Sequence, residues 1–394
     1  MAAAMAATVP VFGAAGLIPV LHDEHGLSLA RAGFIVGMPT LGMMFTLIAW
    51  GWLVDRVGER WVLAIGLALT ALSGVGVMLV SSYVAIGAFL CLGGMAAASA
   101  NAASGRVVIG WFPPEMRGMT MGIRQMAQPL GVGLGALTIP RLAEWKGLHV
   151  AWAFPTALVA VMAILCALFV IDPPRPSRSS AQLSGQLVNP YRVSSLLWRI
   201  HGVSILLQVP QVVVWNFALV WLISDQGWST AAAGVLVTIA QILGALGRMV
   251  VGMVSDRIGS RMRPLRLISL TACGTMLLLG VTDALDLGMV AVGVLVLASI
   301  VTVADNGLAF TSVAEIGGPF WGGRAMGMQN TGQFLIAAIT PSAIGGLIGL
   351  VGYPLTFALT AIFPLLATPV VPTTDRLELP PPAATSVPSE VRVA

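Results

Sequence analysis

The sequence predicts an all-α membrane protein with about 12 transmembrane helices in two pseudo-symmetric six-helix bundles. Hydrophobic residues make up 57% of the 394 residues, charged residues only 9%, and the mean hydropathy is +0.92. A soluble domain carries about 25% charged residues, so this composition indicates a chain dissolved in lipid. Short charged breaks divide the apolar sequence, and one charged decapeptide occurs twice, which predicts two related halves.

The breaks leave segments of about 20 residues, the length that a membrane-spanning helix needs. In the N-terminal bundle (1–171) the predicted helices span 2–21, 29–53, 61–80, 84–109, 119–140 and 149–171. In the C-terminal bundle (196–372) they span 196–223, 230–252, 264–282, 287–310, 325–350 and 353–372. Proline and serine in 172–195 predict a cytoplasmic linker, and the composition of 373–394 predicts a disordered cytoplasmic tail.

The basic residues predict the orientation of these helices. The loops on the side of the decapeptides hold Arg56, Arg60, Arg117, Arg175, Arg178, Arg192, Arg257, Arg261, Arg263 and Arg266, and the opposite side holds only Arg31, Arg141 and Lys146. The positive-inside rule therefore places the decapeptides and both termini in the cytoplasm. No secretory signal is expected, and the bias toward arginine over lysine suggests a bacterial cytoplasmic membrane.

The duplicated decapeptide extends into a longer internal repeat. Gly51–Arg60 returns as Gly252–Arg261 at an offset of 201 positions. Met121–Gln128 returns as Met326–Gln333 at an offset of 205, which also relates Asn101 to Asn306. Parallel halves with matching polar positions are typical of transporters that bind substrate between the halves, near the midplane of the membrane.

With these motifs and the 6+6 layout, residues 1–372 resemble the major facilitator superfamily (MFS) of secondary transporters. The resemblance implies that both decapeptides latch the cytoplasmic side when the transporter faces outward. The implied gating residues are Gly51, Asp55, Arg56, Gly58 and Arg60, with Gly252, Asp256, Arg257, Gly259 and Arg261 in the second copy. The copies depart from the family pattern at Glu59 and Ser260. The alternative is a solvated loop that only fixes topology.

The residue types suit a latch for physical reasons. A glycine at the start of each copy lets two helices approach closely, and a later glycine permits a tight turn. An aspartate at a helix end can contact the positive N-terminus of a facing helix.

An ionisable group inside a predicted helix is a functional hypothesis by default, and three candidates stand out: Arg124, Arg248 and Asp305. The segment around Arg248 is similar to that of anion-transporting branches, including nitrate and monocarboxylate porters, in which the equivalent arginine binds the anion. The alternative is a structural arginine that pairs with an acid or snorkels to the cytoplasm. Nitrate itself is not expected, because Met38–Trp52 holds no arginine.

Further polar residues suggest the rest of a substrate site. The predicted substrate-binding residues are Arg248, Arg124, Gln125, Gln128, Gln211, Trp215, Asn216, Gln329, Asn330 and Gln333. Gln125 and Gln128 are three residues apart and share one helix face. Arg124 lies so near the helix end that it can belong to the gate instead, and Trp215 can be an interfacial anchor rather than a platform for an organic substrate.

Asp305 is the predicted proton carrier, because burial in a medium of low dielectric favours the neutral form of a carboxyl group. The alternative is an ion pair with Arg248 or Arg324 that only holds the bundle together. The interpretation that follows is secondary active transport of a small, carboxylate-like organic anion by alternating access, with proton coupling. The second hypothesis is a drug or metabolite–proton antiporter, for which a large apolar cavity is expected.

Other classes of protein find little support in the sequence. A ligand sensor built on a transporter lacks its signalling domain here, and no metal-ligand set, nucleophile elbow or phosphate loop predicts an enzyme, a metal or a cofactor. The net charge of +4 lies in separate loops, so no nucleic-acid partner is expected. The predicted partners are a small anion, protons and the lipid bilayer, and the protein is expected to be a monomer.

Overall fold

The computed structural model describes residues 1–18, 21 and 26–375. Its first bundle consists of α1 (Ala2–Gly13), η1 (Ala14–Leu17), α2 (Leu29–Val57), α3 (Glu59–Leu79), α4 (Tyr83–Trp111), α5 (Pro114–Gln125) and α6 (Ala127–Phe169). Two short helices, α7 (Arg178–Leu183) and α8 (Pro190–Val193), lie in the linker. The second bundle consists of α9 (Leu196–Ser224), α10 (Thr230–Ile258), α11 (Met262–Ala284), α12 (Gly288–Val301), α13 (Asp305–Thr360) and α14 (Ile362–Val370).

The longest helices contain more than one membrane crossing. α6 breaks at Gly147, and α13 breaks at Gly318 and Gly352, where φ is positive. Eight apolar helical stretches in the described residues are long enough to cross a membrane, and the last of them, Gly288–Val370, supplies three crossings across these breaks. α1 with η1, and α5 continued into α6, supply two more. The twelve-helix arrangement predicted from the sequence is confirmed.

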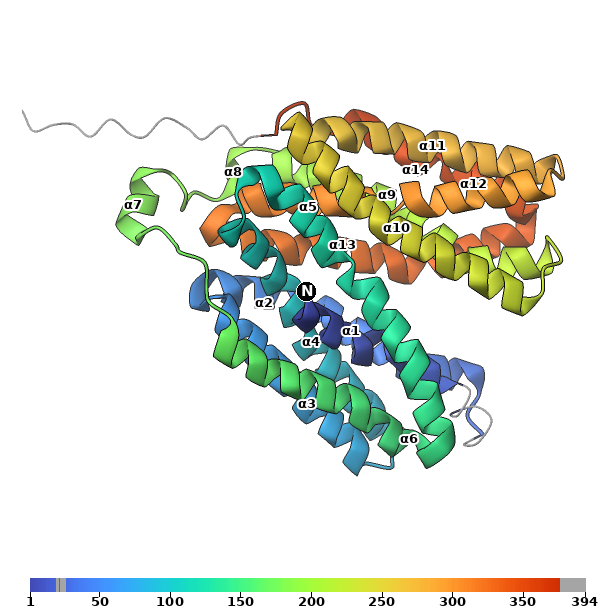
Figure 1. Cartoon of the computed structure of the whole chain (residues 1–394), viewed down its shortest axis with the longest axis horizontal. Helices are drawn as coiled ribbons and strands as arrows, with labels where there is room; N and C mark the ends of the chain where they lie inside the picture. The colour runs from blue at the N-terminus through green and yellow to red at the C-terminus, as the bar shows by residue number, and fades with distance from the viewer. Residues whose placement is uncertain (19–20, 22–25, 376–394) are drawn as a thin grey trace, which may run out of the picture.

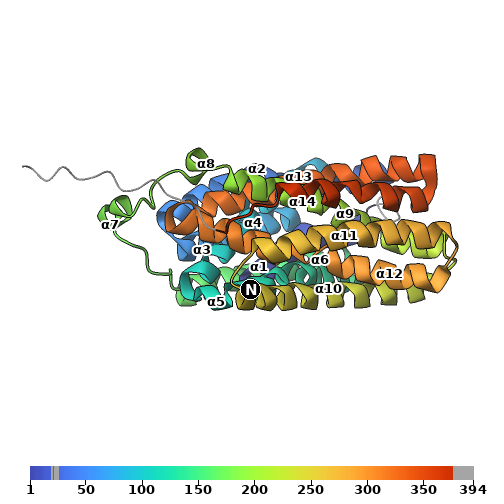
Figure 2. The same ribbon diagram turned by 90° about the horizontal axis from the view of Figure 1, so that it is seen from above.

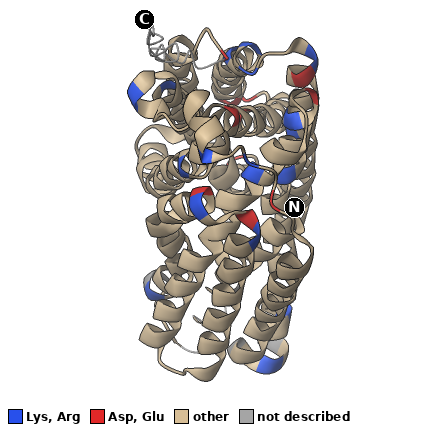
Figure 3. Ribbon diagram, turned by 90° about the vertical axis from the view of Figure 1, so that its left-hand side faces the viewer, with Lys and Arg blue, Asp and Glu red and all other residues tan. Residues whose placement is uncertain are grey.

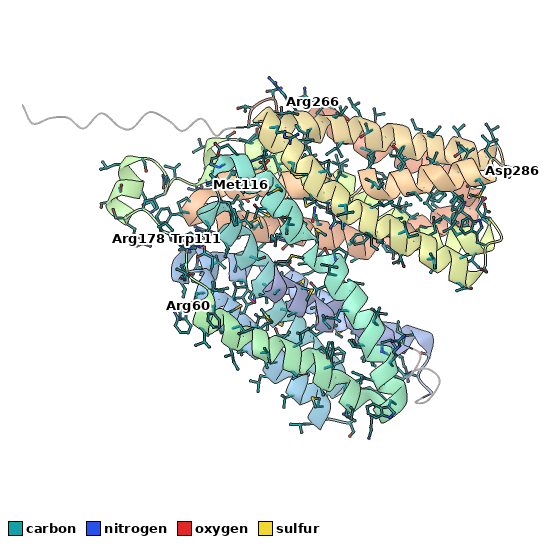
Figure 4. All side chains as sticks on the ribbon, in the orientation of Figure 1. Arg60, Trp111, Met116, Arg178, Arg266 and Asp286 are labelled. Atoms are coloured by element: carbon teal, nitrogen blue, oxygen red, sulfur yellow. The ribbon has the colours of Figure 1, made fainter. Side chains whose placement is uncertain are left out.

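The two bundles converge at one end of the molecule and diverge toward the other (Figure 1). A view turned by 90° shows the helices of both bundles running along the long axis (Figure 2). We call the converging end the motif end, because both decapeptides lie there. In Figure 4 the labelled residues at this end are Arg60, Trp111, Met116, Arg178 and Arg266, and Asp286 lies at the opposite end.

Each bundle has its own apolar core, and one core reaches across the interface. Two clusters of buried side chains fill the first bundle, one around Leu47 and Leu67 and one around Leu21 and Ile139. A third, around Trp221 and Phe357, fills the second bundle. The fourth cluster combines residues of the second bundle with Val108 of α4 and Met121 of α5. Apolar packing therefore joins the two halves in this region.

An aspartate placed after the last helix of each bundle caps a helix of the same bundle. Asp172 accepts a hydrogen bond from the Arg60 backbone N–H at 2.6 Å, at the start of α3. Asp375 accepts hydrogen bonds from the backbone N–H groups of Arg261 (2.6 Å) and Met262 (2.9 Å) at the start of α11. Asp375 belongs to the tail 373–394 that the sequence predicts to be disordered, and the structure describes residues 373–375 of it; residues 376–394 lie outside the described residues.

Replacing Asp375 by alanine is expected to lower the free energy of unfolding by about 1–2 kcal/mol, as loss of a helix cap does. Asp375 also accepts from the Ser260 hydroxyl at 2.7 Å, so three donors lose their acceptor. Unfolding of the purified protein in detergent measures the effect. Asp172→Ala should lower the free energy of unfolding by less than Asp375→Ala does. Thr373→Ala, at an exposed position, should leave it unchanged. An unchanged unfolding midpoint for Asp375→Ala would contradict the capping role.

Candidate functional site

At the motif end the bundles touch backbone to backbone through four glycines. A Cβ atom at Gly51 would collide with the carbonyl oxygen of Gly323, and one at Gly252 would collide with that of Gly118. Gly118 and Gly323 are themselves related by the repeat offset of 205. Contact between α2 and α13 is therefore repeated between α10 and α5, and only glycine permits this approach.

The aspartate of each decapeptide binds the facing bundle near the start of a helix. Asp55 accepts hydrogen bonds from the backbone N–H groups of Gly323 (2.7 Å) and Arg324 (3.1 Å). Asp256 accepts from those of Gly118 (2.9 Å) and Met119 (2.9 Å), which are the equivalent positions. Charge-assisted bonds of this kind are strengthened by the positive end of the helix dipole. We call these two symmetric sets of bonds the first latch (Asp55) and the second latch (Asp256), and they join the two bundles at the motif end.

An arginine completes each latch, but the two arginines come from different places. Arg261 donates to Asp256 at 2.5 Å and to the carbonyl oxygen of Pro114 at 2.9 Å. In the first bundle Arg106 of α4 donates to Asp55 at 3.4 Å and to the carbonyl oxygen of Pro319 at 2.6 Å. Pro114 and Pro319 are again equivalent in the repeat. Arg106 therefore performs for the first latch what Arg261 performs for the second.

The predicted role of Arg60 needs correction, because its guanidinium bonds the carbonyl oxygen of Ala167 in its own bundle. Arg56 and Arg257 are exposed rather than inserted between the bundles. The sequence analysis missed Arg106, although an arginine near the end of the predicted helix 84–109 was a visible signal. Gly58 and Gly259 have φ values of 108° and 68°, so both occupy the tight turns expected of them.

Glu59, where the first decapeptide departs from the family pattern, is an ion-pairing residue in this structure. Its side chain is 0% exposed and pairs with Arg106 at 3.1 Å and with Arg175 at 3.0 Å. Arg175, from the linker, also donates to the carbonyl oxygens of Asp55 and Val54 at 2.9 Å. The acid therefore fits its position because two arginines surround it. Basic and acidic residues both occur at the motif end, which faces the viewer in Figure 3.

A polar cavity of about 370 Å³ lies between the bundles. Its lining residues come from both bundles. They are Ala4, Thr8, Phe12, Thr40, Asn101, Arg124, Gln125, Ala127, Gln128, Val132, Gln208, Gln211, Val212, Trp215, Asn216, Asn306, Phe310, Asn330, Gln333, Phe334, Ala337 and Ala338. Nine of these carry a side-chain amide, and Arg124 is the one charged residue in this lining.

Eight of the ten predicted substrate residues line this cavity, and Gln329 and Arg248 do not. The Gln329 amide turns toward α9, where it bonds His201 Nδ1 at 2.5 Å and the Ser204 hydroxyl. Packing between α13 and α9 thus draws Gln329 away from the cavity. The three cavity amides Gln211, Asn306 and Gln333 form a chain of two hydrogen bonds of 2.8 Å each.

Arg124 is a buried cation whose hydrogen-bond partners are all neutral. Its guanidinium donates to the Ser104 hydroxyl (2.9 Å), the Asn101 carbonyl (2.9 Å) and the Gln125 side-chain oxygen (2.6 Å). The side chain is 5% exposed, and no carboxylate among the described residues lies within 4.0 Å of it. The positive charge of Arg124 is therefore uncompensated at short range.

Arg248 lies behind the cavity, where it ties the two bundles together. Pro129 has no N–H, so the Gln125 carbonyl lacks the helical donor that residue 129 would supply. Arg248 donates to that carbonyl from the other bundle at 3.1 Å, and to the Val303 carbonyl at 3.2 Å. Its side chain is 3% exposed. The structure thus places Arg248 between main-chain acceptors and not in the cavity lining, and among the described residues it shows no ion pair of the kind that the structural alternative assumed.

Asp305 is 2% exposed and stands next to the cavity residue Asn306. Its Oδ1 atom has no hydrogen-bond partner among the described residues. Arg324 bonds Asp55 at 2.9 Å and is not the counter-ion of Asp305. Arg248 interacts electrostatically with Asp305 but forms no ion pair within 4.0 Å in the described part of the chain.

Two related six-helix bundles that close at one end over a polar cavity define the architecture of a membrane transporter. The family model of the Major Facilitator Superfamily matches residues 1–341, and the chain belongs to this family.

The relatives support the same assignment. An uncharacterized MFS-type transporter of Mycobacterium tuberculosis is 51% identical over 360 residues, which cover 91% of this chain and 80% of that protein. The hexuronate transporter of Bacillus subtilis is 24% identical over 246 residues, covering 60% of this chain and 58% of the relative.

Solved structures share the fold. The proton:xylose symporter XylE superposes with a TM-score of 0.74 at 18% identity, covering 95% of this chain and 96% of XylE. A human organic anion transporter superposes with a TM-score of 0.71 at 18% identity, covering 94% of this chain and 98% of the other. The chain is a multi-pass membrane transporter.

Proposed function

We propose that this protein moves a small organic anion, bearing a carboxylate, across a bacterial cytoplasmic membrane by alternating access and in company with protons. The observation that carries the proposal is Arg124, a cation in the cavity lining whose protein partners are all neutral. The hexuronate transporter among the relatives is consistent with a carboxylate substrate.

A buried charge without a counter-ion is costly in a membrane protein, so a ligand of opposite charge gains the interaction that the protein leaves unmade. The guanidinium is planar and offers several parallel N–H donors, which suits a carboxylate. Arg248 contributes through its bonds to the Gln125 and Val303 carbonyls, since these hold the segment that carries Arg124. Antiport of an apolar drug is less favoured, because nine of the 22 lining residues carry a side-chain amide.

The proposal includes the orientation of the protein, with the motif end and its arginines in the cytoplasm. In this orientation both latches are closed on the cytoplasmic side, which corresponds to an outward-facing conformation. Alternating access then requires that the bonds of Asp55 and Asp256 to the facing bundle break when the cavity opens inward.

Uptake by proteoliposomes under an imposed pH gradient tests the function. Radiolabelled carboxylates should enter and should exchange with unlabelled carboxylate, whereas cationic drugs should neither enter nor compete. Liposomes without protein give the background for membrane-permeant acids. If cationic drugs are transported and carboxylates are not, the anion proposal is wrong and the antiporter hypothesis replaces it.

Asp305→Asn is expected to abolish the acceleration of uptake by the pH gradient, because the amide cannot take up and release a proton. Carboxylate exchange at equal pH on both sides should continue, since exchange needs no net proton movement. The comparison of gradient-driven uptake with exchange, in the same liposomes, checks this. Unchanged acceleration in the variant would remove Asp305 as the proton carrier.

A further inference from the structure

We infer that the substrate is a polyhydroxylated carboxylate, an acid with several hydroxyl groups along its carbon chain, rather than an apolar acid. The inference rests on the proposed transport of an organic anion and goes further by naming the chemistry of the rest of the molecule. Arg124 accounts for the carboxylate only, and the many side-chain amides of the cavity lining remain to be explained.

The amides are distributed over both bundles in equivalent positions. Three pairs related by the offset of 205 line the cavity, namely Asn101 with Asn306, Gln125 with Asn330, and Gln128 with Gln333. Each amide presents both donors and acceptors, as a hydroxyl group does. A ligand between the bundles is therefore met by hydrogen-bonding groups from both bundles.

Several of these groups have donors to spare. No hydrogen bond connects the side-chain amides of Gln128 or Gln208 to another described residue. The indole N–H of Trp215, another lining residue, is buried and also has no partner among the described residues. These three donors come from both bundles, and a ligand in the cavity is what they can bond.

An apolar ligand would displace water from Gln128, Gln208 and Trp215 without offering them a hydrogen bond, and unpaired polar groups shielded from water are strongly unfavourable. Hydroxyl groups replace the lost water by donating to the amide oxygens and accepting from the amide N–H groups. A site built to bond hydroxyl groups rejects an analogue that lacks them more sharply than an apolar pocket rejects a hydroxyl. The volume of about 370 Å³ falls in the range of small-molecule sites.

Three six-carbon probes separate the contributions of charge and hydroxyl groups. Gluconate carries both a carboxylate and hydroxyl groups, hexanoate keeps the carboxylate alone, and glucose keeps hydroxyl groups without the charge. We expect the purified protein to bind gluconate on the order of 100-fold more tightly than hexanoate and about 10- to 100-fold more tightly than glucose. Titration calorimetry and competition with gluconate uptake in proteoliposomes both measure this order.

A pair of variants locates the effect in the cavity. Gln128→Leu should weaken gluconate binding by about 10-fold and leave hexanoate binding unchanged or stronger. Gln241→Leu is the matched control, because Gln241 lies on α10 outside the central cavity and should change neither. The comparison of probes on the wild-type protein does not depend on how well either variant folds.

The outcomes distinguish this inference from the proposed function beneath it. If hexanoate binds as tightly as gluconate, or if Gln128→Leu changes nothing, the polyhydroxylated substrate is wrong while anion transport survives. If glucose binds as tightly as gluconate and no carboxylate is preferred, the anion proposal itself is overturned.

Discussion

Replacing Arg124 by glutamine is expected to reduce carboxylate uptake by about 100-fold, in the range that loss of a buried charge-assisted hydrogen-bond pair produces. The offset of 205 relates Arg124 to Gln329, so the equivalent helix of the second bundle already carries a glutamine at this position. We therefore expect the helix around residue 124 to accommodate the change. The variant keeps polar contacts to Ser104 and Asn101 within reach but removes the positive charge. Initial rates of uptake at several carboxylate concentrations measure the effect.

Two controls define what the result means. Arg124→Lys keeps the charge but not the planar fork of donors, so uptake should be intermediate. Arg56→Gln removes an exposed arginine that stacks on Trp52, and uptake should stay near that of the wild type. Carboxylate uptake that is equal for Arg124→Gln and the wild type would show that the anion is bound elsewhere.

The second large effect is expected at the first latch, where Asp55→Asn should shift the protein away from the conformation closed at the motif end. Asp55 accepts three hydrogen bonds from the facing bundle: the backbone N–H groups of Gly323 and Arg324 and the Arg324 side chain. The substitution also leaves the buried Arg106 with one carboxylate fewer. Breaking a buried ion pair by changing one partner costs about 3–5 kcal/mol, which is enough to invert a two-state population.

Distances between spin labels on the two bundles measure this shift. Trp111→Cys and Arg266→Cys place one label on each bundle at the motif end (Figure 4), in a background whose three native cysteines are replaced. The distribution should move to longer distances in Asp55→Asn. Asp256→Asn, which changes the symmetric latch, should act in the same direction, and Arg56→Gln should not. An unchanged distribution in Asp55→Asn would contradict the latch.

Much of the architecture could be predicted because it depends on features that follow one another along the chain. Membrane crossings follow from the lengths of apolar segments, and the relation between the halves follows from repeat offsets of 201 and 205. The offsets also relate equivalent amides of the cavity lining, such as Gln125 and Asn330. Side chains three residues apart on a helix share a face, so the grouping of Gln125 with Gln128 was accessible as well.

The partners of the charged residues were not accessible in this way. Arg60 and Arg261 occupy equivalent positions in the repeat, yet Arg60 bonds a carbonyl of its own bundle and Arg106 stands in its place at the latch. Long arginine side chains reach several acceptors, and the choice depends on which carbonyl groups lack another donor. Pro129 leaves the Gln125 carbonyl without a helical N–H donor. Arg248 donates to this carbonyl and therefore does not line the cavity.

The sequence by itself determined the membrane class, the two related halves and the positions of the decapeptides, because hydrophobic length and repetition act locally along the chain. Only the tertiary structure decided the partners of the polar side chains. It places Arg124 in the cavity lining without a counter-ion, turns Gln329 toward α9, and lets Arg248 bond the carbonyl of Gln125 in the other bundle. These choices depend on how two bundles dock, since docking sets which donors and acceptors come within hydrogen-bonding distance across the interface.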